Sequence, residues 1–461
     1  MARHFYGRHE ELKALHDRLD APGFQMVSVY GRRRVGKTTL INKFVEESGA
    51  RVISYVALER DEREQLESLG ETVLACLAPD LIGSVSFDSF EKIFDFVARH
   101  AAQERIIFLI DEYPYLAKEC RHMNSLLQRY VDHEWATTQL YLVLCGSLVT
   151  FMRESVLGEG APLHGRSTLE LRLRPMDYLE SASFVPNYTN EEKAIVYGLT
   201  GGVPKYLEQF DDDKPLDDNI ASQFFSSTGY FSEEQIQTLL TADRARPAAF
   251  NSIISSVALG HTKHNEIQKD LGGTDITYYL NVLVNAGVLE KRYSGTRPYY
   301  GIADGMVSFW YRYVNKAQSI INAGAGERYL DQAVKGHMHD FMGPVFEQMA
   351  RQYLFSHMGE DELPFFATRI EEQQTTVKDP EGRLRQIELD LVGYDGKKPV
   401  LVGECKFRNQ QFDRAELDRL LEKISLLPMK TPRVVLFSLG GFTQSVLDED
   451  VLAIDSDMMY R

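Results

Sequence analysis

The residue types with the clearest chemistry lie in one short segment near the start of the chain. Residues 31–38 read G-R-R-R-V-G-K-T, a full match to the G-x-x-x-x-G-K-[ST] phosphate-binding loop. In such a loop, consecutive backbone N–H groups at the start of a helix surround a polyphosphate. Lys37 is expected to reach the β- and γ-phosphates of ATP, and Thr38 to offer its hydroxyl to Mg²⁺. The candidate contacts are the whole loop and the residue after it: Gly31, Arg32, Arg33, Arg34, Val35, Gly36, Lys37, Thr38 and Thr39.

Two acidic residues that end a strongly apolar run supply a second part of an ATPase site. Residues 106–110 form this strand-like run, and Asp111 and Glu112 follow it directly. A carboxylate delivered beside a phosphate loop is the expected partner of Mg²⁺, a role we assign to Asp111. Glu112 is then placed to polarise the attacking water. The alternative is an ordinary strand that ends in two solvated acids, and the phosphate loop upstream favours hydrolysis.

Other polar residues are candidates for contacts around the nucleotide, each with a structural alternative. Ser147 ends a third apolar run, L-C-G-S, where its hydroxyl could sense the γ-phosphate or position water. A simple strand-ending turn explains Ser147 equally well. Arg166 could contact the γ-phosphate in its own or a neighbouring subunit, although a surface arginine is slightly favoured. The three loop arginines could approach phosphates, but solvated side chains are favoured there.

A second group of acids lies in the last quarter of the chain. Residues 387–407 read as two strand-like runs with a turn at Asp395-Gly396 between them. If the hairpin is symmetric about Lys397, Asp390 faces Glu404. Period-two alternation then gives one polar and one apolar face. The polar face holds Glu388, Asp390, Glu404 and Lys406, and the apolar face holds Ile387, Leu389, Leu391, Cys405 and Phe407.

A carboxylate pair with a nearby lysine on a rigid sheet is what metal-assisted phosphodiester hydrolysis requires. Asp390 and Glu404 would hold Mg²⁺, and Lys406 would orient or activate water and offset charge on the scissile phosphate. The alternative is a solvated hairpin face with cross-strand ion pairs, which is common in antiparallel sheets. Spacing alone leaves these two interpretations near even.

An α/β framework must position the first group of residues. In residues 1–207, apolar strand-like runs alternate with amphipathic helical stretches, a pattern that predicts a parallel sheet covered by helices on both faces. The predicted strands are Gln25–Tyr30, Val52–Ala57, Arg105–Ile110 and Gln139–Cys145.

Residues 208–330 predict a helical and winged-helix module. Residues 208–218 contain six acids, one lysine and a proline and are interpreted as an exposed connection, followed by helix to about residue 260. The predicted winged helix consists of helices at Asn265–Leu271 and Thr274–Ala286 around a Gly-Gly turn, and a wing at Val288–Tyr300 turning at Ser294-Gly295.

Residues 331–461 repeat an α/β pattern and carry the second group of acids. The predicted elements are a helix at Val345–His357, strands at Ile387–Tyr394 and Pro399–Phe407, a helix at Ala415–Leu426 and a strand at Arg433–Leu439.

The first motifs resemble those of a known family, the archaeal-type ATPases of the STAND branch of AAA+-related NTPases. The resemblance rests on F-Y-G-R-H-E-E-L, the phosphate loop, I-D-E-Y-P-Y-L, L-C-G-S and T-G-G-V-P-K-Y-L. It implies that the last of these is a G-x-P signature near the adenine, with Pro204 beside the base. It also implies that residues 5–8 help to close over the base. From the residues alone, Gly201–Pro204 could equally be a helix-breaking turn.

The charge of the predicted winged helix gives little support for base reading. Its presumed recognition helix contains one acid and neither Lys nor Arg. The flanking basic residues are Lys263, Lys269, Lys291, Arg292 and Arg297. Phosphate contacts from the wing are conceivable, whereas base readout looks poor. Because such modules often transmit nucleotide state in STAND-type ATPases, we favour that structural role over a DNA-binding regulator.

The C-terminal D…E-x-K arrangement resembles the PD-(D/E)-x-K, restriction-endonuclease-like superfamily. Archaeal-type ATPases frequently have a C-terminal domain of this kind. Glu347 matches the position where that superfamily often adds an acid, although an exposed helical glutamate explains it almost as well. No proline precedes Asp390, which departs from the motif. The implied fold class is α/β: a P-loop NTPase parallel sheet with a helical lid, a winged-helix module, and a C-terminal restriction-endonuclease-like domain. A binding-only C-terminal domain of a signalling or scaffold ATPase remains the alternative.

Composition limits the possible partners. The net charge of −16 does not favour broad nonspecific nucleic-acid binding, although it leaves a local basic groove open. No apolar run approaches the length of a membrane span, and the first residues contain no apolar signal segment. The 4 scattered cysteines include no C-x-x-C pair, so a reducing cytoplasm is the expected location. The expected partners are ATP, Mg²⁺ and DNA or RNA, and a homo-oligomer is left open.

Overall fold

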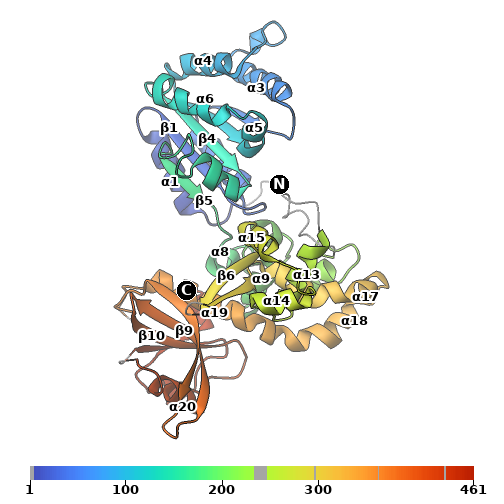
Figure 1. Ribbon diagram of the computed structural model, residues 1–461, viewed down its shortest axis with the longest axis vertical. Helices are drawn as coiled ribbons and strands as arrows, with labels where there is room; N and C mark the ends of the chain where they lie inside the picture. The colour runs from blue at the N-terminus through green and yellow to red at the C-terminus, as the bar shows by residue number, and fades with distance from the viewer. Residues whose placement is uncertain (1–4, 233–246, 295–296, 362, 430–431) are drawn as a thin grey trace. The chain divides into compact units, whose positions relative to one another are not determined.

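The computed structural model describes residues 5–232, 247–294, 297–361, 363–429 and 432–461 (Figure 1). The chain divides into two compact units. The first contains the residues up to Pro175 together with Val203–Lys205, and the second contains Met176–Gly202 and the chain from Tyr206 onward. Part of the helix predicted to run to about residue 260, and the predicted wing turn at Gly295, lie outside the described residues.

The first unit is built on a five-stranded parallel sheet. Its strands are β1 (Gln25–Tyr30), β2 (Arg51–Val56), β3 (Ile106–Asp111), β4 (Leu140–Gly146) and β5 (Leu169–Arg172). They lie in the order β2–β3–β4–β1–β5. The four predicted strands are confirmed to within one residue, because near-continuous apolar runs mark strands covered on both faces. Strand β5 was not predicted, since it is short and its side chains alternate between half-buried and exposed.

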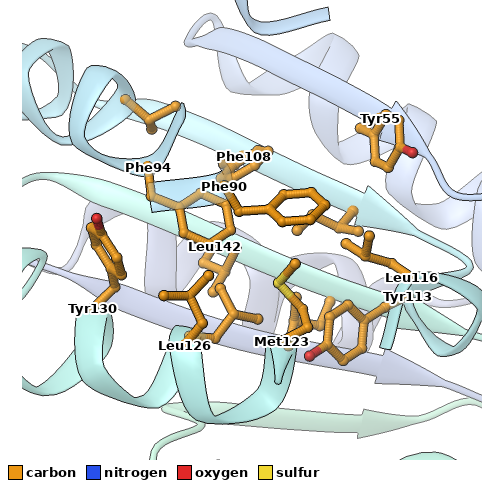
Figure 2. Close-up of a cluster of buried hydrophobic side chains, with 14 of the residues drawn as sticks. Tyr55, Phe90, Phe94, Phe108, Tyr113, Leu116, Met123, Leu126, Tyr130 and Leu142 are labelled. Atoms are coloured by element: carbon orange, nitrogen blue, oxygen red, sulfur yellow. The ribbon is translucent and has the colours of Figure 1, made fainter. Parts of the chain in front are cut away.

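Helices cover both faces of this sheet. They are α1 (His9–Asp20), α2 (Lys37–Ser48), α3 (Glu62–Leu77), α4 (Phe90–Ala101), α5 (Tyr113–Glu119), α6 (Met123–Arg129) and the short α7 (Val149–Phe151). The sheet side chains alternate between two hydrophobic clusters, one shared with α1 and α2 and the other with α3–α6. Figure 2 shows the second cluster, where Phe94 of α4 packs edge-on against Phe108 of β3 with ring centroids 6.2 Å apart. These two cores fix the strand ends that carry the candidate residues.

The second unit begins with a helical part. Its helices before the winged helix are α8 (Tyr178–Ala182), α9 (Asn190–Thr200), α11 (Leu216–Phe224) and α13 (Pro247–Ala258), with α10 (Pro204–Leu207) starting in the first unit. After the winged helix come α16 (Gly305–Phe309), α17 (Gln318–Asn322), α18 (Gly326–Tyr329) and the long α19 (Met338–His357). The predicted connection at residues 208–218 is largely exposed, as expected for its charge.

The winged-helix pattern is present. It consists of α14 (His264–Asp270), α15 (Thr277–Asn285) and the antiparallel pair β6 (Leu289–Ser294) and β7 (Arg297–Ile302). Helix α15 starts later than predicted because both glycines of the turn, Gly272 and Gly273, have positive φ. In addition, the Asp275 carboxylate accepts the Thr277 backbone N–H at 2.9 Å and so fixes the helix start.

The C-terminal part of the second unit is a five-stranded mixed sheet. Its strands are β8 (Arg369–Lys378), β9 (Leu384–Asp395), β10 (Lys398–Lys406), β11 (Arg433–Ser438) and β12 (Leu452–Asp455), and its helices are α20 (Arg414–Ser425), α21 (Gln444–Leu447) and α22 (Ser456–Met459). The order is β12–β11–β10–β9–β8, antiparallel from β8 to β10 and parallel from β10 to β12. The predicted elements are confirmed, whereas β8 and β12 were not predicted.

Two helices pack on opposite faces of the middle of this sheet. Leu417 of α20 shares a hydrophobic cluster with Val402 and Leu436, so α20 covers one face. On the other face, Phe346 of α19 packs against Phe407, with ring centroids 5.4 Å apart. The carboxyl end of β10 is therefore held rigidly between two helices. Among the described residues, no helix combines the length and the apolar character needed to cross a bilayer.

Candidate functional site

The phosphate loop joins β1 to α2, and its two glycines are structurally required. A Cβ on Gly31 would lie 2.4 Å from the Leu173 carbonyl oxygen, so no side chain fits there. Gly36 has φ +91°, a conformation that favours glycine, and it immediately precedes the first residue of α2. Thr38 and Thr39 are exposed on the first turn of α2, where a hydroxyl can reach a ligand. Val35 is buried and anchors the loop to the core.

Lys37 is buried inside the loop and folds back onto it. Its ammonium donates to the Gly31 carbonyl at 2.9 Å and to the Arg32 carbonyl at 3.1 Å. Burial lowers the pKa of Lys37, and the nearby acids Glu112 and Asp111 counter part of that effect. A buried cation with only neutral partners is well placed to exchange them for phosphate oxygens.

Three strand ends converge beside the loop. Tyr30 of β1 pairs with Gly146 of β4, and β4 in turn lies between β1 and β3. Consequently Asp111 and Glu112, at the end of β3, and Ser147, after β4, lie along one edge of the sheet with the loop. Glu112 has φ +49°, which is strained for a residue with a side chain and is typical of functional sites.

Ser147 holds the carboxylate of Glu112. Its hydroxyl donates to Glu112 Oε2 at 2.8 Å, and its backbone N–H donates to the same oxygen at 3.2 Å. The Glu112 backbone N–H in turn donates to Asp111 Oδ1 at 2.9 Å. The sequence singled out Ser147 as a candidate phosphate sensor or a plain turn, and in this structure its contact is to the candidate base.

Other candidate residues divide between those near the loop and one held elsewhere. Pro204 lies at the loop, because a Cβ on Gly36 would be 3.7 Å from its ring. Arg33 donates to the Tyr115 hydroxyl at 3.2 Å. Arg166, in contrast, forms a bidentate ion pair with Asp132, with both N···O distances 2.7 Å. In this structure the Arg166 guanidinium is therefore engaged by Asp132, and its proposed contact with the γ-phosphate stays a prediction.

One residue beside the loop was missed by the sequence analysis. Cys145 is fully buried at the end of β4, and burial followed by the neighbouring Asp111 raises the pKa of its thiol. The sequence signal that could have indicated Cys145 was its position two residues before Ser147 in L-C-G-S.

The second group of acids lies where β9 and β10 separate. Gly403 pairs with Leu391, so the register brings Glu404 next to Asp390, as the predicted symmetry about Lys397 requires. One Asp390 oxygen accepts the Cys405 backbone N–H at 2.8 Å. This bond anchors the carboxylate at the end of the antiparallel pairing.

A β-bulge in β9 corrects the predicted alternation. Asp390 and Leu391 together lie opposite the single residue Glu372 of β8. The extra residue shifts the alternation of side chains along β9. The apolar side chains before the bulge were predicted to lie on the face opposite Glu404, but they lie on the same face as Glu404. One cluster under α20 therefore contains residues of both parities: Ile387, Leu389, Val392 and Val402. The bulge also aims Asp390 at the fork between the strands.

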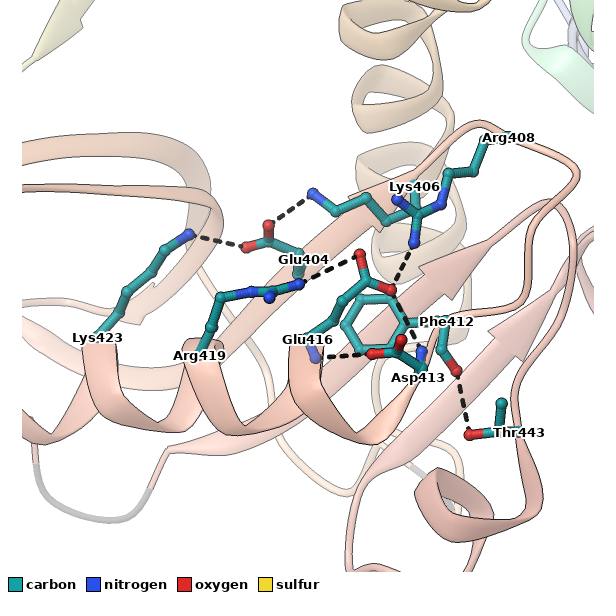
Figure 3. A network of polar contacts seen from close by, with 9 residues as sticks. All are labelled: Glu404, Lys406, Arg408, Phe412, Asp413, Glu416, Arg419, Lys423 and Thr443. Carbon is teal, nitrogen blue, oxygen red and sulfur yellow. Dashed lines mark hydrogen bonds and ion pairs between the residues drawn. The ribbon is translucent and has the colours of Figure 1, made fainter.

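Two lysines bind the buried carboxylate of Glu404 (Figure 3). Lys406 Nζ donates to Oε1 at 2.7 Å, and Lys423 Nζ of α20 lies 3.4 Å from Oε2. Burial alone would lower the pKa of Lys406, but the Glu404 carboxylate outweighs burial and raises it. Lys423 was missed by the sequence analysis, because only the fold brings α20 to the end of β10.

Two further carboxyl groups near this point have raised pKa values. Burial, with Glu404 second, raises the pKa of Asp390 to about 6. Burial, with Asp390 second, raises the pKa of Glu347 on α19 to about 7. The nearest cation of Glu347 is Arg351, 3.7 Å away. Carboxyl groups with raised pKa values in a polar cluster suit proton exchange or a cation.

The donor chemistry fits a hard divalent cation, although the described side chains do not form a complete cage. Carboxylate oxygens of Asp390 and Glu404 are ligands that Mg²⁺ prefers. Among the residues that the structure describes, no three His, Cys, Asp or Glu side chains are grouped closely enough to hold a metal. Two carboxylates with water and substrate oxygens remain a sufficient donor set for Mg²⁺.

The winged helix contributes few free cations to a nucleic-acid surface. Arg292 of β6 is paired with Glu290, and Lys263 lies 3.3 Å from Glu266. Lys291 is exposed. These local ion pairs are consistent with the packing role favoured above.

Comparisons with known proteins match two segments of the chain. A family model for an ATPase domain predominantly from Archaea matches residues 5–210, and a model for archaea bacterial proteins of unknown function matches residues 310–418. An uncharacterized protein of Methanocaldococcus jannaschii is 30% identical over 416 residues, covering 88% of this chain and 88% of that protein. The family model that matches residues 310–418 includes Asp390, Glu404 and Lys406.

Solved structures show more distant likenesses. The Walker-type ATPase of Pyrococcus abyssi has a TM-score of 0.47 and 20% identity, covering 67% of this chain and 96% of that one. The ORC2 protein of Aeropyrum pernix has a TM-score of 0.45 and 13% identity, covering 70% of this chain and 97% of that one. The assignment of the first unit rests on the family match and on the strand order and loop geometry described above.

Proposed function

This chain belongs to the same family as the uncharacterized Methanocaldococcus jannaschii protein and contains an archaeal-type ATPase domain, and from this premise we propose that its nucleotide state controls a nuclease-like C-terminal site. The protein is an ATPase. The catalytic residues, the second activity and its nucleic-acid substrate are the proposed part. The observation that carries the proposal is the group formed by Asp390, Glu404 and Lys406 at the fork of β9 and β10.

In the ATPase site, each step is assigned to a residue of this chain. Lys37 exchanges its loop carbonyls for the β- and γ-phosphates, and the exposed Thr38 hydroxyl and Asp111 would hold Mg²⁺. Bound Mg²⁺ supplies positive charge to the phosphates. Glu112 polarises the attacking water. Ser147 keeps the Glu112 carboxylate in place through two hydrogen bonds and so acts as a positioning residue.

In the second site, the same logic applies to a phosphodiester. Asp390 and Glu404 would hold Mg²⁺, which supplies Lewis-acid polarisation of the scissile phosphate. Lys406 moves from Glu404 to the water or to the phosphate once Glu404 has another partner. The raised pKa of Glu347 suits a group that accepts or returns a proton near neutral pH.

The connection between the two sites is supported by the course of the chain. Helix α9 packs against α19, where the Tyr197 hydroxyl accepts hydrogen bonds from Gln348 at 3.1 Å and Gln352 at 2.9 Å. Helix α19 also carries Glu347. Directly after α9, the chain enters Val203–Lys205, the residues that lie at the phosphate loop. A change at the loop would therefore act on a segment continuous with α9, which packs against the helix that carries Glu347.

A binding-only C-terminal domain is the second candidate, and one observation favours it. Both oxygens of Glu404 are engaged by lysines, so a cation must displace at least one of them. In that case the domain would bind nucleic acid or a protein without cutting, as in a signalling ATPase.

The experiment that separates these candidates is incubation of the purified protein with DNA and with RNA, with and without ATP and Mg²⁺ or Mn²⁺. Cleavage and phosphate release are both recorded. We expect Lys37→Ala to lose phosphate release and Asp390→Ala to lose cleavage while still hydrolysing ATP. Glu360→Ala, an exposed acid beyond α19, serves as the control. If the wild type cuts neither nucleic acid under any condition, the nuclease assignment fails and the binding-only candidate stands.

A further inference from the structure

A row of four cationic side chains borders the second site. Lys406 and Arg408 lie at and beyond the end of β10, and Arg419 and Lys423 lie on α20 (Figure 3). Arg419 and Lys423 are four residues apart, so they project from the same face of the helix. Only Lys406 belongs to the motif recognised in the sequence. We call these four residues the cation row.

The cation row covers acids that are themselves buried. The Glu404 side chain is 11% exposed and lies under Lys406 and Lys423. The Glu416 side chain is 9% exposed, binds Arg408, and lies 3.9 Å from Arg419, which is 66% exposed. Solvent therefore meets the cations, while the compensating charges lie beneath them.

Two buried polar atoms beside the row lack a hydrogen-bond partner among the described residues. They are Arg408 Nε and Ser438 Oγ. Ser438 is fully buried and pairs with Lys406 across the parallel strands β10 and β11, so the two side chains lie on one face of the sheet. A donor left unpaired costs free energy unless a ligand or water satisfies it. Because Ser438 is fully buried, a ligand would have to enter the sheet face beside Lys406 to satisfy its hydroxyl.

We propose that the cation row binds the sugar-phosphate backbone of one nucleic-acid strand, with Arg419 and Lys423 on phosphates that neighbour the bond at Asp390 and Glu404. This inference rests on the proposed function, since it supplies the substrate surface for the same site. Lysine and arginine side chains are the usual phosphate partners, and such contacts fix register without reading sequence. The long contacts at Arg419 and Lys423 leave both side chains able to turn toward phosphate.

The row also matches the scale of a strand. From Arg419 to Lys423 the helix rises by roughly 6 Å, which is comparable to the separation of two consecutive phosphates of an extended strand. Binding through this face should therefore tolerate any sequence and depend steeply on salt.

The test uses the full chain and a fluorescent oligonucleotide, single-stranded or duplex, in EDTA so that binding is measured without cleavage. We expect Arg419→Ala and Lys423→Ala each to weaken binding roughly 3- to 10-fold at about 0.1 M salt and to reduce the salt slope by about 1. Lys423→Arg should restore binding because it keeps the charge. Lys397→Ala, an exposed lysine at the β9–β10 turn, is the matched control and should change nothing.

The outcomes separate this inference from the function on which it rests. If binding persists with an unchanged slope in both alanine variants, the cation row is refuted even when the wild type cleaves. If the wild type binds neither the single-stranded nor the duplex oligonucleotide, the proposed role of the cation row is refuted as well. If the wild type never cleaves but binding depends on the row, the nuclease assignment falls and the surface stands.

Discussion

Glu347 offers a quantitative test of the electrostatics of the second site. Its pKa of about 7, raised by burial from 4.5, means that the native state keeps a proton that the unfolded chain loses above pH 4.5. Between pH 4.5 and 7 the folded protein therefore loses stability as the pH rises, and above pH 7 the loss is complete. A shift of this size corresponds to about 3 kcal/mol, and the side chain is sufficiently enclosed, at 22% exposed, for that conversion.

Replacing Glu347 with Gln removes the charge but keeps the shape. We expect the variant to equal the wild type near pH 5 and to exceed it by about 3 kcal/mol at pH 8 in EDTA. Urea unfolding monitored by Trp310 fluorescence in a Trp135→Phe background reports on the second unit, since the chain has 2 tryptophans. Glu360→Gln is the control. Equal stability of Glu347→Gln and wild type at pH 8, or a less stable variant, would refute the reasoning.

Further predictions concern the ATPase site. Lys37→Ala should lower the rate of phosphate release at least about 100-fold, because a buried cation is lost where charge develops; a rate within a few-fold of wild type contradicts the assignment. Ser147→Ala should reduce kcat about 10- to 100-fold with little change in KM, since Glu112 loses the shorter of the two hydrogen bonds that hold its carboxylate; an unchanged kcat argues against positioning. Gly31→Ala should lower the thermal midpoint, because its Cβ would meet a carbonyl oxygen at 2.4 Å, whereas Gly336→Ala, which has open space, should not.

The first site could be predicted closely because its information is local. The phosphate loop, the apolar strands and the acids that follow them lie within short segments, and buried parallel strands announce themselves by continuous apolar runs. The bond between Ser147 and Glu112 could not be predicted, since it depends on β4 lying between β1 and β3. Strand order is a long-range property that no local pattern encodes.

The second site was predicted in part. The pairing of Gly403 with Leu391 agrees with the predicted symmetry about Lys397, whereas the pairs next to the turn are one residue out of that register because of an irregularity between Pro399 and Leu401. The bulge in β9 was not predicted. It arises where β9 pairs with β8, and the polar sequence of β8 did not indicate a strand. Lys423 was missed because it reaches the site from α20, an element outside the hairpin.

The central claim is that nucleotide state controls the second site, and one measurement tests it most directly. Asp390-dependent cleavage should be compared between wild type and Lys37→Ala, each with and without ATP, at fixed Mg²⁺ and oligonucleotide concentration. We predict that ATP changes the cleavage rate of the wild type several-fold and leaves that of Lys37→Ala unchanged. Cleavage that responds equally to ATP in both proteins, or in neither, would contradict the account.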